Sequence, residues 1–233
     1  MTTHGAEPDS LKVPLTQAQV DAADQLQSKL KGWKLYEGVL RDLADRFPSN
    51  CVLAHVLPKA ITLNSLYATG ILAIHQMAGH IVEVAKTSGD HSSPNLAEEI
   101  ARLTDLGPER KTRNCLSFAS KYCHFFVDAT RFAILDSYAA DALVFHLGRG
   151  TVKGGSYRNY LQAVDRLIAT ADLQCSYNQL DHYLWLRGQE MRFRQHGEGA
   201  DINKEVMALF SRPEAECQAL IETAFGHLPQ AGQ

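Results

Sequence analysis

The fold is decided by residues 113–126, which read RNCLSFASKYCHFF. At the ~100° step of an α-helix, apolar side chains fill one arc of this segment, while Ser117, Ser120 and His124 fill the other. The same helical period extends over most of the chain, and no run of residues alternates between polar and apolar as a strand does. The sequence therefore predicts an all-α fold, a globule of many helices.

Working outward from this segment, helical periodicity and end signals predict about ten helices. Thr16 caps the first of them, which runs to about Lys31, and Ser49 or Asn50 starts the third. The other predicted ranges are 35–46, 70–86, 96–104, 113–126, 137–147, 157–171, 178–195, 202–210 and 213–224.

The composition is that of a protein with a packed core, because 45% of the 233 residues are hydrophobic. Residues 1–14 hold no apolar run typical of a signal peptide, and polar residues break every apolar stretch before the ~20 residues needed to span a bilayer. We expect a soluble, cytoplasmic protein with a flexible tail over 1–14 and a single helical domain over 15–233.

The five cysteines are widely spread and form no C-x-x-C pair, so they are expected to be free thiols. The nearest pair of histidines, His75 and His80, is spaced five apart, which places them on different sides of a helix. The sequence thus predicts neither a metal nor another cofactor. A hydrolase that uses Cys123 is a weaker alternative, for which the sequence nominates no histidine on another helix.

Positive charge gathers in the middle of the chain, where residues 110–194 carry 12 Lys+Arg and 7 Asp+Glu between two acidic flanks. Residues 148–156 read GRGTVKGGS and offer backbone amides with two cations, although no strand precedes them as a P-loop requires. These features indicate a polyanion site, with a merely solvated surface as the alternative. The predicted DNA contacts are Arg110, Lys111, Arg113, Arg149, Lys153 and Arg158.

Lys121 lies at the boundary of the two arcs of its helix, about 40° from Phe125 at the ~100° helical step. A lysine half removed from water has a lowered pKa, and its free amine is a nucleophile. The alternative is an ordinary surface lysine whose stem covers apolar surface while the ammonium stays in water.

Asp136 follows the apolar residues 132–135 and opens a predicted helix. A helix N-cap of this kind needs no further role, because its side chain accepts a hydrogen bond from a free backbone N–H. The same geometry also holds an ionised carboxylate rigidly where it can stabilise a cation. Asp136 and Lys121 are therefore a candidate catalytic pair.

Asp181, Trp185 and Gln189 follow one another at a spacing of four, which places an acceptor, a flat aromatic surface and an amide along one helical stripe. Such a stripe suits a planar heterocycle with N–H donors. The alternative is that Trp185 belongs to the core and that Asp181 is a surface charge.

Three motifs together, FASK at 118–121, ILD at 134–136 and Asp181 with Trp185, resemble the 8-oxoguanine DNA glycosylases of the helix-hairpin-helix superfamily. The likeness is to the archaeal type and the related bacterial OGG-fold proteins. It covers about residues 50–195, which it implies are the catalytic core. It implies a cleft between two helical subdomains, and a monomer whose partner is double-stranded DNA with a damaged or modified base, with no membrane.

By position, the resemblance implies that Lys121 is the Schiff-base lysine and Asp136 the catalytic aspartate. Asp181 and Trp185 become the base-edge acceptor and the stacking platform, with Phe125 and Gln189 also beside the base. Residues 106–111 read LGPERK, with one glycine where the family has a hairpin, and Lys111 is the alternative catalytic lysine.

The implied activity is cleavage of an N-glycosidic bond after the base is flipped out of the helix, with or without lyase activity. The implied substrate is 8-oxoguanine, in DNA repair, or a hypermodified phage base such as glucosylated hydroxymethylcytosine, in antiviral defence. The alternative function is a non-catalytic helical module of the same fold that binds DNA or another protein.

Overall fold

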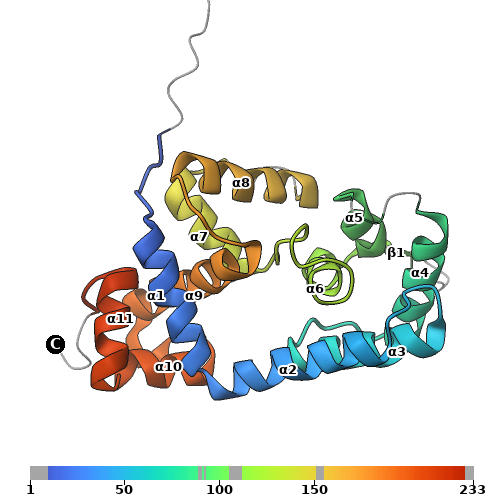
Figure 1. Ribbon diagram of the computed structural model, residues 1–233, viewed down its shortest axis with the longest axis horizontal. Helices are drawn as coiled ribbons and strands as arrows, with labels where there is room; N and C mark the ends of the chain where they lie inside the picture. The colour runs from blue at the N-terminus through green and yellow to red at the C-terminus, as the bar shows by residue number, and fades with distance from the viewer. Residues whose placement is uncertain (1–9, 89–90, 92, 105–111, 151–154, 229–233) are drawn as a thin grey trace, which may run out of the picture.

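The computed structural model describes residues 10–88, 91, 93–104, 112–150 and 155–228, and for residues 104 and 112–114 it describes the backbone alone. Within these ranges eleven α-helices confirm the predicted all-α class (Figure 1). The helices are α1 Gln17–Lys29, α2 Lys31–Arg46, α3 Leu53–Leu66, α4 Ile74–Thr87, α5 Asn95–Ala101, α6 Leu116–Phe126, α7 Ser137–Leu147, α8 Tyr157–Thr170, α9 Tyr177–His196, α10 Lys204–Ser211 and α11 Ala215–Phe225.

A short hairpin differs from the prediction that the chain holds no sheet. Strand β1 Arg102–Thr104 pairs in antiparallel fashion with β2 Thr112–Asn114, where the sequence predicted the end of one helix and the start of the next. Strands of three residues are too short for alternation of polar and apolar residues to reveal them.

The predicted caps at Thr16 and Asp136 are confirmed. Thr16 forms a capping box with Gln19 at the start of α1, because the side chain of each residue bonds the backbone N–H of the other. Asp136 begins α7 in the same manner, since its Oδ1 accepts a hydrogen bond of 2.8 Å from the backbone N–H of Ala139.

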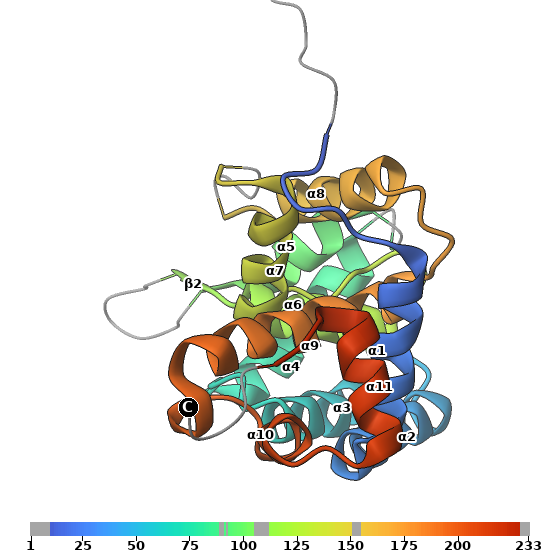
Figure 2. The same ribbon diagram turned by 90° about the vertical axis from the view of Figure 1, so that its left-hand side faces the viewer.

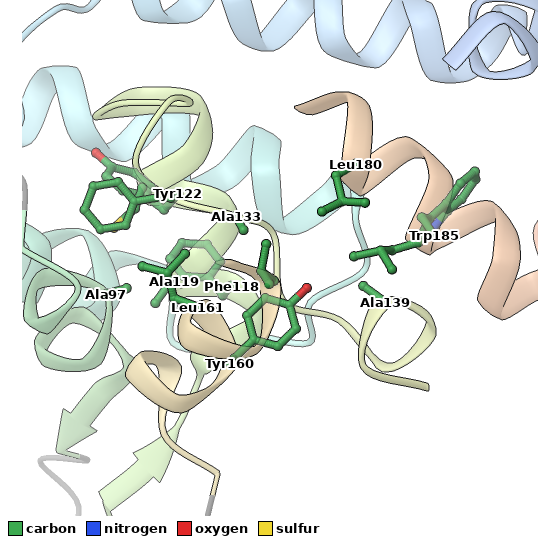
Figure 3. Packing of buried hydrophobic residues seen from close by; sticks show 14 of the residues in the cluster. Ala97, Phe118, Ala119, Tyr122, Ala133, Ala139, Tyr160, Leu161, Leu180 and Trp185 are labelled. Atoms are coloured by element: carbon green, nitrogen blue, oxygen red, sulfur yellow. The ribbon is translucent and has the colours of Figure 1, made fainter. Parts of the chain in front are cut away.

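The helices form two groups around one continuous core. In one group α3 packs against α4 and α6, and α5 packs against α6; in the other α9 packs against α1 and α7, and α1 against α11. Figure 2 shows α1 beside α11, so the first helix lies among the last ones. The close view in Figure 3 shows Phe118 and Ala119 of α6 near Leu161 of α8, with Leu180 and Trp185 of α9 on the other side.

Part of the predicted tail is fixed to the helical body. The backbone N–H groups of Lys12 and Val13 donate to the carbonyl oxygen of His146 over 2.7 and 3.3 Å, and Leu15 is buried. Residues 1–9 of that tail lie outside the described residues. No helix in the described part of the chain is long and apolar enough to cross a membrane.

Gly188 sets the contact between α7 and α9. A Cβ atom at this position would stand 2.3 Å from the carbonyl oxygen of Tyr138, a distance that no real side chain tolerates. The missing side chain therefore lets α9 approach the first turn of α7. This contact places the face of α9 that carries Asp181 and Trp185 next to Asp136.

Candidate functional site

The extended segment that leads into Asp136 is held by side chains instead of by a neighbouring strand. A buried carbonyl oxygen needs a hydrogen-bond donor, and each carbonyl of residues 132–135 has one. The donors are His124 Nδ1 to Phe132 at 2.7 Å, the Tyr157 hydroxyl to Ala133 at 2.8 Å, the Tyr160 hydroxyl to Ile134 at 2.6 Å, and the Ser120 hydroxyl to Leu135 at 3.3 Å. The backbone that leads into Asp136 is therefore rigidly held.

Lys121 and Asp136 lie side by side, with 4.0 Å between the Lys121 Nζ and the Asp136 Oδ2. Because Asp136 uses its Oδ1 to cap α7, its other carboxylate oxygen faces the ammonium. The Lys121 ammonium donates to the hydroxyl of Ser117 over 2.9 Å and lies 3.4 Å from the carbonyl oxygen of Leu135. Neutral acceptors thus hold the ammonium, with the carboxylate next to it.

Lys121 is more deeply buried than the sequence predicted, since only 3% of it is exposed. The predicted polar arc of α6 is covered as well, and Ser120 and His124 are buried against the segment that leads into Asp136. Burial lowers the pKa of Lys121 below its ordinary value, against the opposing charges of Asp136 and Asp181. The pKa of Lys121 is therefore lowered, as the sequence predicted, and the burial that lowers it is more complete than expected.

Asp136, Asp181, Trp185 and Phe125 line one cavity, as the sequence predicted for a shared site. Lys121 is not among the lining residues; its Nζ lies 5.7 Å from the ring centre of Tyr67, which does line the cavity. The other lining residues are Gln27 from α1, Trp33 and Glu37 from α2, Tyr67 after α3, Ile134 before α7, and Asn178 and His182 from α9.

The indole of Trp33 stacks on that of Trp185, and both rings line the cavity. Its volume is about 10 Å³, which is room for about one water molecule. The resemblance implied a base held by Asp181 and Trp185, but the cavity as it stands has no room for one.

A larger cavity of about 520 Å³ lies on the other side of Ser117, the hydroxyl partner of Lys121. Its wall includes the loop between α3 and α4, where 87% of Leu72 is exposed. Ser117 thus both lines this larger cavity and holds the Lys121 ammonium.

Three acidic residues line the cavity, Glu37, Asp136 and Asp181, and His182 lies among them. Burial, together with the charge of Asp136, raises the pKa of Asp181 well above its ordinary value. His182 bonds Asp24 over 2.6 Å and Glu37 over 3.2 Å. Burial alone lowers the pKa of His182, but these two carboxylates outweigh it and raise it to about 9. His182 is therefore an imidazolium at pH 7.

Gln27 presents an unused acceptor at the cavity. The residue is 4% exposed, and among the described residues its buried Oε1 has no hydrogen-bond partner. Buried polar atoms are almost always paired. An N–H group of a bound molecule would satisfy this oxygen.

Gln189 does not reach the cavity, in contrast to the prediction. Eight residues at a rise of ~1.5 Å place it about 12 Å along α9 from Asp181. Its side chain is fully buried and accepts a hydrogen bond of 2.8 Å from the backbone N–H of Asn203, which begins α10. Gln189 therefore joins α9 to α10.

The predicted DNA contacts are described only in part. Arg149 is exposed, and Arg158 is exposed with its guanidinium donating to the Asn95 Oδ1 over 2.6 Å. Arg110, Lys111 and Lys153 lie outside the described residues, and of Arg113 only the backbone in β2 is described. Lys111 therefore stays a prediction as the alternative catalytic lysine.

Cys123 does not support the hydrolase alternative. The thiol is buried, and burial raises its pKa far above the ordinary value, so the thiolate does not form. Within the described ranges no three His, Cys, Asp or Glu side chains are grouped so that they could hold a metal ion.

Sequence reasoning missed the contribution of the first two helices. Gln27, Trp33 and Glu37 all precede residue 50, where the predicted catalytic core began. The available signal was the spacing of Trp33 and Glu37, which are four apart and so share one face of α2. Their approach to α9 is a tertiary contact that helical spacing does not reveal.

Comparisons with known proteins match about half of the chain. The family model HI_0787_N, described as an N-terminal domain, matches residues 17–130. A curated relative from Haemophilus influenzae, described as an uncharacterized protein, is 31% identical over 132 residues, which are 55% of this chain and 63% of the relative. The match thus spans less than two thirds of that relative's length. No solved structure matches the chain. The region matched by the family model contains Trp33 and Lys121 and ends before Asp136 and Asp181.

Proposed function

We propose that the protein is a DNA glycosylase that flips a damaged or modified base out of DNA and cleaves its N-glycosidic bond. The observation that carries this proposal is the pair of Lys121 and Asp136, which lie 4.0 Å apart, with Asp136 in the wall of a cavity that Asp181 and Trp185 also line. A buried amine, a fixed carboxylate and a stacking surface are the groups that base excision requires. The cavity lies between the two groups of helices, which would form the walls of the cleft.

The proposed reaction begins with departure of the base. The bond from C1′ to the base nitrogen breaks, its electron pair leaves with the base, and the sugar becomes an oxocarbenium-like cation. The carboxylate of Asp136 stabilises that cation. Lys121, as a free amine, then donates its lone pair to C1′ and gives up a proton to the departed base, which leaves a covalent adduct from which lyase cleavage can follow. The alternative is that Lys121 orients the attacking water, whose proton goes to the base.

The base would be held by stacking and by acceptors. Once the indoles of Trp33 and Trp185 separate, a base between them contacts both faces, and each such contact is worth roughly 1–3 kcal/mol. Asp181, which its raised pKa of about 8 leaves largely protonated at pH 7, still accepts a hydrogen bond through its carbonyl oxygen. Together with the unpaired Oε1 of Gln27 it favours a base with N–H groups. 8-Oxoguanine and glucosylated hydroxymethylcytosine both fit this description and differ in volume.

We further propose that duplex DNA is bound by a monomer in the cytoplasm, without a cofactor. The open hollow beside Ser117 offers the way by which the sugar reaches Lys121. The cations proposed to contact phosphates are Arg110, Lys111, Arg113, Arg149, Lys153 and Arg158.

The test is a borohydride trap with duplexes that contain 8-oxoguanine, uracil, hydroxymethylcytosine or its glucosylated form, followed by alkali to reveal abasic sites. We expect base release from one of these duplexes and a trapped adduct that Lys121→Ala abolishes and Lys111→Ala retains. Abasic sites without an adduct mean that Lys121 orients water. An adduct that is lost only in Lys111→Ala would show that Lys111 is the nucleophile.

The small volume of the cavity, which leaves no room for a base, favours a second candidate. This candidate is a non-catalytic helical module that binds DNA or another protein. In that case no duplex yields abasic sites, and Lys121→Ala leaves DNA binding unchanged. Such a result rejects the glycosylase.

A further inference from the structure

His124 lies between two oxygen atoms, although a neutral imidazole has only one N–H group. Its Nδ1 is 2.7 Å from the carbonyl oxygen of Phe132, and its Nε2 is 3.3 Å from the amide of Asn178, with the oxygen Oδ1 placed toward the ring. A backbone carbonyl only accepts hydrogen bonds, so Nδ1 carries the proton. In the neutral ring Nε2 then carries a lone pair and accepts hydrogen bonds, and a carbonyl oxygen has no hydrogen to donate to it.

The ring is neutral at pH 7. Only 3% of His124 is exposed, and burial lowers its pKa below the ordinary value. The cationic His182 acts in the same direction, while the bonds to Phe132 and Asn178 and the charge of Glu37 oppose it. A neutral His124 needs a donor at Nε2, and the NH₂ group of Asn178 is the donor at that place.

We propose that the Asn178 amide donates from Nδ2 to His124 Nε2 and turns its carbonyl oxygen into the cavity, as a specificity-determining acceptor. The oxygen and nitrogen of an amide fill almost the same space, so this orientation needs no other movement. It satisfies every atom of the His124 ring and leaves Oδ1 of Asn178 for a ligand.

This orientation deepens the proposed function, on which it rests, by naming the base edge that the cavity reads. Asn178 and Asp181 are three residues apart on α9, both line the cavity, and such neighbours have Cβ atoms about 5–6 Å apart. Two acceptors side by side suit a base edge with two adjacent N–H donors. The N1–H and the exocyclic amine of a guanine-type base form such an edge.

The orientation itself is tested without any enzymatic assay, by ¹⁵N NMR of the histidine rings in the full chain at pH 7. The His124 signals are identified by their loss in His124→Gln. We expect a protonated Nδ1 and an unprotonated Nε2 that accepts a hydrogen bond. A ring protonated at both nitrogens overturns the proposal, because Asn178 Oδ1 would then face His124.

The effect on specificity is tested with duplexes that contain 8-oxoguanine or 8-oxohypoxanthine, which lacks the exocyclic amine. Asn178→Asp keeps an oxygen at the cavity and should hold the excision ratio of the two bases within about threefold, whereas Asn178→Leu should lower it roughly tenfold. An unchanged ratio in Asn178→Leu overturns the specificity role. If the unmodified protein excises neither base, the glycosylase has failed for these substrates, and the NMR result alone decides the orientation.

Discussion

The indole of Trp33 lies face to face with that of Trp185, with ring centroids 4.6 Å apart and planes inclined by 15°. The sequence contains two tryptophans, so this pair accounts for both of them. Stacked indoles couple their electronic transitions, which predicts an exciton couplet in the circular dichroism spectrum. Trp33→Phe and Trp185→Phe should each abolish the couplet while the helical signal is retained.

The same couplet reports on opening of the cavity. Saturation with a duplex whose base is excised should weaken it, because a base between the indoles separates them; the catalytically impaired Asp136→Asn variant keeps the complex intact during the measurement. An unmodified duplex serves as the control. A couplet that is unchanged by the substrate duplex would mean that the base binds elsewhere.

Asp136 caps α7 and faces Lys121 with different oxygen atoms, so its two roles separate in two variants. Asparagine also caps helices, and Asp136→Asn should change the free energy of unfolding by only a few tenths of a kcal/mol, whereas Asp136→Ala should cost about 1 kcal/mol. Both variants lose the charge that stabilises the sugar cation, and base release should fall by roughly 100-fold or more. Thermal denaturation and alkali cleavage measure the two effects. If the Asp136→Asn variant still releases the base at the wild-type rate, the carboxylate has no part in the mechanism.

Gly188 is expected to tolerate no side chain. A Cβ atom 2.3 Å from the Tyr138 carbonyl oxygen pushes α9 away from α7, and Gly188→Ala should destabilise the protein by about 3 kcal/mol or more. Gly79 in α4 is the matched control, because a Cβ atom there meets nothing within 4 Å. Gly79→Ala should stabilise the protein by about 0.5–1 kcal/mol. Denaturant unfolding distinguishes the two, and equal effects would show that the contact between α7 and α9 is loose.

His182 predicts a stability that depends on pH. The carboxylates of Asp24 and Glu37 outweigh burial and raise the pKa of His182 to about 9, from about 6.5 in the unfolded chain. A raised pKa contributes stability that is fully present below pH 6.5 and is lost as the pH rises through 9. His182→Gln should therefore cost roughly 2–3 kcal/mol near pH 6 and much less near pH 10.

Urea unfolding across this pH range measures the difference between the two proteins. His196→Gln changes an exposed histidine on the same helix and should leave the profile unaltered. A constant difference between wild type and His182→Gln from pH 6 to pH 10 contradicts an imidazolium at this position.

Helical periodicity and capping predicted most of the fold, because they are local. The predicted starts of α7 at Ser137 and α8 at Tyr157 coincide with those observed, and each helix follows a residue whose side chain caps it. The hairpin of β1 and β2 was missed because its strands are three residues long. The burial of both arcs of α6 also escaped prediction, since it depends on the segment that leads into Asp136, which packs across the polar arc.

The candidate site was predictable for residues whose own side chain and sequence motif indicate their chemistry. Lys121, Asp136, Asp181 and Trp185 come together as expected from their sequence contexts. Trp33 was not identified, because an aromatic residue on an amphipathic helix is typical of core packing and only the tertiary structure places it on Trp185. Gln189 was wrongly included, since a shared helical stripe gives the direction of a side chain but not its distance along the axis.

The enclosure of Lys121 has a consequence for the idle protein. Exposed lysines are modified slowly by sugars and metabolic aldehydes, which form imines with free amines. With 3% of its surface exposed, Lys121 should react with such electrophiles more slowly than an exposed lysine does. The burial that lowers the pKa of this amine thus also slows its chemical damage.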